Sequence, residues 1–73
     1  MIAKYRPHYN DIIEYIYKRV VANAGQNQVA MEVQEKFRPE IFFPKMDPEM
    51  VYETICMMYE LAFFIVNKKP YKE

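Results

Sequence analysis

The sequence predicts an all-α fold of three helices, at about residues 10–24, 28–37 and 48–67, joined by a connector rich in proline and phenylalanine. Two observations predict this fold: apolar residues recur every three or four positions, and helix start and stop signals flank the segments. A third is composition, because a chain of 73 residues with 52% hydrophobic residues, seven tyrosines and five phenylalanines has the material for a folded core. We therefore expect a folded helical protein without strands.

The length of the chain allows one domain, over residues 1–73, with flexible ends at 1–8 and 68–73. A chain this short is marginally stable without a disulfide, a metal ion or a second subunit. Cys56 is the only cysteine, so no intramolecular disulfide is available. With one cysteine and one histidine, the chain also cannot form a closed Cys/His zinc site. Association with a second subunit is therefore the remaining source of stability.

The first helix is predicted from its ends and from its apolar face. Asp11 and Glu14 follow a proline near the start, and Gly25, the only glycine, lies where a helix C-terminus favours that residue. Between these positions one face is apolar and is expected to be core: Ile12, Ile13, Ile16, Val20 and Ala24.

The second helix is short, and we expect Asn27 to be its N-cap. Val29 or Ala30, Val33 and Phe37 have helical spacing, whereas Glu32, Gln34, Glu35 and Lys36 are expected to face water. The helix ends before Pro39, because a proline disfavours α geometry at the preceding residue.

The connector carries Pro39, Pro44 and Pro48 around the apolar run Ile41, Phe42 and Phe43. This run can be a hydrophobic plug that covers one end of the helices, or an exposed docking epitope. The plug is the preferred interpretation, since an exposed run of this kind promotes aggregation.

The third helix has the clearest start signal in the chain, with Asp47 as N-cap, Pro48 at the first helical position and Glu49 in the first turn. Its polar residues share one narrow stripe, at positions Glu49, Glu53, Glu60 and Asn67. The rest of its circumference is apolar and needs to be covered.

Two shorter helices with one apolar face each cannot enclose a third helix that is apolar on most sides. We therefore predict a homodimer formed largely through residues 48–67. We also predict docking to an unidentified protein partner. The candidate residues for the dimer or partner interface are Phe42, Phe43, Met50, Tyr52, Met57, Met58, Tyr59, Phe63 and Phe64.

The composition lacks most of the residues that catalytic and cofactor-binding sites require. The chain has no serine, one glycine, one histidine (His8) and one cysteine, which exclude a Ser-His-Asp arrangement, a glycine-rich phosphate loop and a closed Cys/His zinc set. Pairing of Cys56 with His8 is formally possible, but a buried structural thiol is preferred. We expect no enzyme activity, no cofactor and no metal.

The predicted function is that of a small non-enzymatic protein–protein interaction module, a regulator, adaptor or inhibitor of a larger protein, acting as a helical homodimer. The alternative is a helix-turn-helix-like DNA-binding regulator that uses residues 10–37, with Gln26, Asn27 and Gln28 able to read base edges. A formal net charge of zero, and acidic residues Glu32 and Glu35 on the second helix, argue against nucleic acid as a partner.

The cellular location of the protein is predicted from its N-terminal residues and from its cysteine content. The first residues contain no apolar signal segment, and an unpaired cysteine fits a reducing compartment. The apolar stretch 50–66 includes Glu53 and Glu60, which are costly within a bilayer. We expect a cytoplasmic protein without a membrane span.

Overall fold

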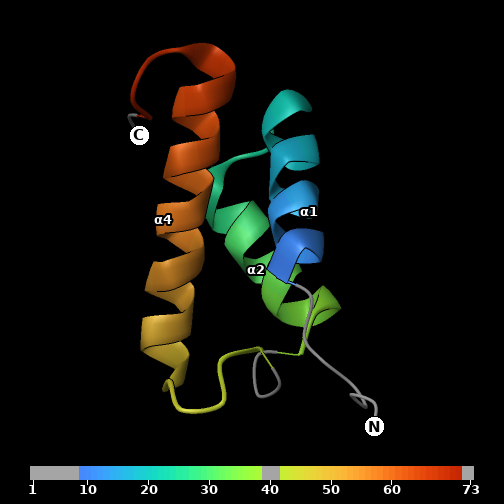
Figure 1. The fold of residues 1–73 in the computed structure, drawn as a ribbon, viewed down its shortest axis with the longest axis vertical. Coiled ribbons are helices and arrows are strands. Elements are labelled where there is room, and N and C mark those ends of the chain that lie inside the picture. The colour runs from blue at the N-terminus through green and yellow to red at the C-terminus, as the bar shows by residue number, and fades with distance from the viewer. Residues whose placement is uncertain (1–8, 39–41, 72–73) are drawn as a thin grey trace, which may run out of the picture.

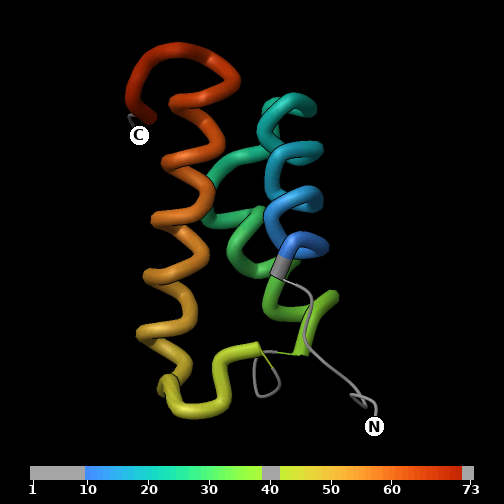
Figure 2. Tube along the Cα trace, viewed as in Figure 1, coloured from blue at the N-terminus to red at the C-terminus, as the bar shows by residue number. Residues whose placement is uncertain are grey.

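The computed structural model describes residues 9–38 and 42–71 and contains three helices, α1 (Tyr9–Val21), α2 (Gln26–Lys36) and α4 (Pro48–Asn67). No strand occurs in the described part of the chain, so the all-α, three-helix prediction is confirmed. In Figure 1, α1 and α4 run in the same direction and α2 returns in the opposite one. The trace in Figure 2 shows the short turn that joins α1 to α2 and the longer connector that leads into α4.

Helix α1 ends earlier than residue 24, the predicted end, and for a different reason. Asn23 adopts the left-handed conformation (φ 67°), its N–H donates to the carbonyl of Val20, and the N–H of Ala24 donates to the carbonyl of Arg19. This pair of hydrogen bonds satisfies the free carbonyls at a helix end. The prediction that Gly25 ends α1 was therefore wrong: Asn23 supplies the left-handed residue.

Gly25 is instead the N-cap of α2, with φ −78° and ψ 163°. The prediction of Asn27 as N-cap was wrong, because α2 starts at Gln26 and places Asn27 inside the first turn. There the Oδ1 of Asn27 accepts a hydrogen bond from the hydroxyl of Tyr52 on α4. The predicted core side of α2 is confirmed, since Val29, Ala30 and Val33 are buried.

Helix α4 has the bounds that the sequence predicts. The side chain of Asp47 accepts a hydrogen bond of 3.0 Å from the N–H of Met50, and Pro48 occupies the first turn. The helix stops where Lys68 adopts the left-handed conformation (φ 60°). The polar stripe is also confirmed, because all four of its members are exposed: Glu49, Glu53, Glu60 and Asn67.

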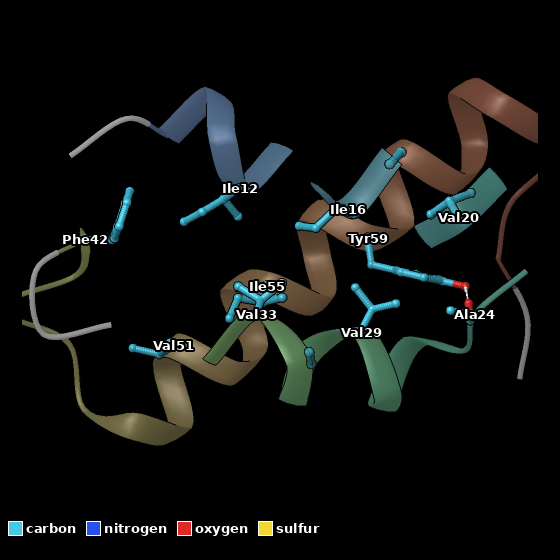
Figure 3. Packing of buried hydrophobic residues seen from close by; sticks show 12 residues of the cluster. Ile12, Ile16, Val20, Ala24, Val29, Val33, Phe42, Val51, Ile55 and Tyr59 are labelled. Atoms are coloured by element: carbon cyan, nitrogen blue, oxygen red, sulfur yellow. Dashed lines mark hydrogen bonds between the residues drawn. The ribbon is translucent and has the colours of Figure 1, made fainter. Parts of the chain in front are cut away.

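The core lies where the three helices meet, as Figure 3 shows. Its five largest fully buried side chains are Ile12, Ile16, Val29, Val33 and Ile55. Tyr59 belongs to the same core, and its hydroxyl donates a 2.6 Å hydrogen bond to the carbonyl of Ala24, which ties α4 to the turn between α1 and α2 (Figure 3). This bond satisfies the one polar atom of a buried ring.

The connector closes one end of this core. Phe42 is buried and packs edge-on against Phe37, with ring centres 5.8 Å apart, while Phe43 is partly buried against the same cluster. The plug interpretation is thus confirmed for Phe42. Ile41 and Pro39 lie outside the described residues.

At the other end, the chain beyond α4 folds back onto the helix. The ring of Tyr71 packs edge-on against Tyr59 and Phe63, with ring centres 5.0 and 5.1 Å apart. No sequence pattern predicted this contact. Flexibility of the predicted ends 1–8 and 68–73 stays a prediction, and residues 1–8, 72 and 73 lie outside the described part of the chain.

Candidate protein-interaction surface

Helix α4 has two apolar faces, and only one of them is covered. Val51, Ile55, Tyr59 and Ala62 recur at helical spacing and are buried against α1 and α2. Four other side chains, here called the α4 outer face, remain largely exposed: Met57 and Leu61 at 64%, and Phe64 and Ile65 at 52%. Because these residues are three and four positions apart, they form one continuous patch.

A shallow apolar groove lies beside this patch, between α1 and α4. Its volume is about 200 Å³, which is small for a cofactor or drug-sized ligand. Helix α1 contributes Ile13, Ile16 and Tyr17 to the lining, and α4 contributes Met58, Leu61, Ala62 and Ile65. Helix α2 contributes no lining residue, so the groove opens on the side that α2 leaves uncovered.

The candidate interface residues from the sequence divide into three groups. Met50, Met57 and Phe64 are exposed, and Met58 lines the groove. Phe43, Tyr52 and Phe63 are half-buried against the chain's own core. Phe42 and Tyr59 are buried within that core, with 6% and 3% of the residue exposed.

Two central residues of the α4 outer face, Leu61 and Ile65, were not among the candidate interface residues. In the sequence these two residues are distinguished only as part of the apolar circumference of residues 48–67. The signal that could have selected them is their position relative to the polar stripe. Leu61 and Ile65 lie away from both that stripe and the buried row that contains Ile55, whereas Tyr59 belongs to the buried row.

The polar contacts of the described chain hold the helices together. Glu32 of α2 accepts hydrogen bonds from the hydroxyl of Tyr15 (2.9 Å), from the guanidinium of Arg19 (2.9 and 3.2 Å) and from the amide of Gln28 (2.9 Å). These donors lower the pKa of the Glu32 carboxyl, Gln28 most strongly. Burial and the bond to Glu32 raise the pKa of Tyr15. The cluster therefore joins α1 to α2.

The side chains considered for reading DNA bases all hydrogen-bond within the chain, although Asn27 and Gln28 are exposed. Gln26 is buried, and its amide donates to the carbonyl of Cys56 (3.3 Å) and to the Oε2 of Glu60 (2.9 Å). Asn27 bonds to Tyr52 and Gln28 to Glu32. Glu32, expected to face water, is half-buried in its cluster.

Within residues 9–38 and 42–71, His, Cys, Asp and Glu side chains form no group of three that could hold a metal ion. Cys56 is half-buried, and His8 lies outside the described residues. None of the helices in the described chain has both the length and the apolar character needed to cross a membrane.

Comparisons with protein-family models, with curated proteins and with solved structures found no match for this chain. The most distinctive features of its surface are the α4 outer face and the adjoining groove.

Proposed function

We propose that the protein is a small non-enzymatic protein–protein interaction module that acts as a helical homodimer. The observation that carries the proposal is the α4 outer face, an uncovered apolar surface on the C-terminal half of α4. In the dimer, this face of one copy covers the same face of the other. Each subunit keeps its remaining surface for a larger protein, which the module regulates, links or inhibits in the cytoplasm.

The area of the patch supports self-association. With about 200 Å² for a fully exposed side chain of this size, the α4 outer face leaves roughly 450 Å² of apolar surface in contact with water. Patches of roughly this size on monomers are often functional. Two such faces together, with the groove residues beside them, approach the roughly 1,000 Å² that specific interfaces exceed.

Charge also permits the pairing. The formal net charge of the chain is zero, so two copies do not repel each other over long range. The patch itself contains no charged residue, and burial of uncharged side chains carries no ionic desolvation cost.

The test is the mass of the protein in solution, measured by light scattering on a size-exclusion column over a dilution series. We expect a mass of twice the 8.9 kDa chain. Leu61→Asp places a charge at the centre of the patch and should raise the dissociation constant at least about tenfold. A wild-type protein that remains monomeric at all concentrations contradicts the proposal.

Met31→Asp is the matched control. Met31 lies on α2, is 59% exposed and is absent from the groove lining, so the same substitution there costs a similar amount of helix propensity. The variant should stay folded and dimeric. Equal loss of dimer in both variants would show a general effect of the added charge rather than a specific interface.

The larger partner is tested by purification of the tagged protein from its own cells. We expect one protein at a fixed stoichiometry with the wild type. Purification of the homodimer alone, from cells that express it at native level, argues against an adaptor or inhibitor role.

A further inference from the structure

We propose that the two copies pair antiparallel, with the two-fold axis passing beside Leu61 of each α4. This inference rests on the proposed homodimer and specifies its arrangement. The occupant of the groove between α1 and α4 is then helix α4 of the second copy.

The spacing of the patch favours this axis. Met57 and Met58 lie one helical turn before Leu61, and Phe64 and Ile65 lie one turn after it. An antiparallel two-fold arrangement at Leu61 brings Phe64 of one copy against Met57 of the second copy. On the opposite side of the seam it brings Ile65 against Met58 of the second copy. Every member of the α4 outer face then has an apolar partner.

The directions of the helices favour the same arrangement. Helices α1 and α4 run parallel, and α2 runs against both on one side of them (Figure 1). The groove opens on the other side, between the two parallel helices. An incoming helix antiparallel to them completes a four-helix packing in which the incoming helix and α2 both oppose α1 and α4, and helix dipoles favour antiparallel neighbours.

Charge complementarity discriminates between the two possible directions. Exposed acidic residues lie at the N-terminal end of α4, with Asp47 as its N-cap and Glu49 and Glu53 in its first half, whereas exposed Lys68 and Lys69 follow its C-terminal end. Glu53 lies about 12 Å before Leu61 along the helix and Lys68 about 10 Å after it. Antiparallel pairing therefore places Glu53 beside Lys68 of the second copy, while parallel pairing places like charges together.

The test uses two single-cysteine variants, Glu53→Cys and Lys68→Cys, each in a Cys56→Ala background, with a short thiol-to-thiol cross-linker. Neither position belongs to the α4 outer face, so both variants should remain dimeric by light scattering. We expect the mixture of the two variants to give a cross-linked 53–68 dimer at a yield at least about fivefold above either variant alone, because equivalent positions lie more than about 20 Å apart in the antiparallel pair.

The outcomes separate this inference from the proposed function. Strong cross-linking of Glu53→Cys with itself shows a parallel pair and overturns the antiparallel arrangement, as does a dimeric mixture that gives no 53–68 product. A monomeric mass for the wild-type protein overturns the homodimer itself. A tripled mass contradicts the two-fold axis.

Discussion

At the scale of single residues, polar side chains mainly connect the helices to each other. Gln26 bonds from α2 to α4, Tyr59 from α4 to the α1–α2 turn, and Glu32 from α2 to α1. In the described chain no buried side-chain nitrogen or oxygen lacks a hydrogen-bond partner. Such satisfied polar groups cost little and favour one arrangement of the helices over others.

The Glu32 cluster gives a pH-dependent contribution to stability. Because hydrogen bonds lower the pKa of Glu32 in the folded state, its contribution is complete above the ordinary glutamate value of 4.5 and is lost as the pH falls through the lowered pKa. We expect Glu32→Gln to unfold at lower urea concentration than wild type at pH 7. The difference should close as the pH falls below 4.5.

The control for this experiment is Glu35→Gln, at an exposed glutamate of the same helix. Circular dichroism during urea titration at several pH values measures both variants. A gap between wild type and Glu32→Gln that stays constant down to pH 3 contradicts the role assigned to Glu32.

At the scale of the helices, the ends differ in how well their backbone groups are satisfied. Helix α4 has a side-chain cap at Asp47, and α1 ends with the hydrogen-bonded turn at Asn23. Helix α2 has no side-chain cap at its start, because Gly25 has no side chain to accept from the free N–H groups. Of the two helix starts whose caps are described, that of α2 is thus the one without a side-chain cap.

Gly25→Ser should stabilise the protein. The backbone angles at Gly25 suit any residue, and a Cβ placed there meets no atom within 4 Å. A serine hydroxyl can cap α2, and the unfolded chain loses freedom, so we expect a gain of about 0.5–1 kcal/mol in the free energy of unfolding. Urea denaturation measures it.

Gly25→Ala separates the two contributions. Alanine restricts the unfolded chain as serine does but caps a helix poorly, so its gain should be smaller. Equal stability of the serine and alanine variants would show that no cap forms.

At the scale of the whole molecule, the apolar surface that the three helices leave exposed favours association of the chain with another protein surface. Three helices bury one core between them, yet the α4 outer face and the groove beside it stay uncovered. Folding and association are therefore expected to be linked.

This linkage predicts that the thermal midpoint depends on protein concentration. A tenfold increase in concentration stabilises a dimer at the expense of unfolded monomers, and for a chain of this size the expected rise is about 3–5 °C. Differential scanning calorimetry measures it. Leu61→Asp should show a midpoint independent of concentration, and a concentration-independent wild type would indicate that the chain folds as a monomer.

The helical class and the bounds of α4 could be predicted from the sequence, because capping and proline signals act through neighbouring residues. Asp47 and Pro48 act within the first turn of α4, whatever the remainder of the chain does. The sequence was less informative at the α1–α2 turn, where either Gly25 or Asn23 could supply the left-handed residue and only the packed turn selects Asn23.

Which apolar residues of α4 remain exposed depends on how the three helices pack together. The sequence marks most of its circumference as apolar, and spacing cannot say which part meets α1 and α2. The positions of those two helices bury Ile55 and Tyr59 and leave Leu61 and Ile65 in contact with water. Burial depends on neighbours distant in sequence, so the candidate surface became visible only when all three helices were in place.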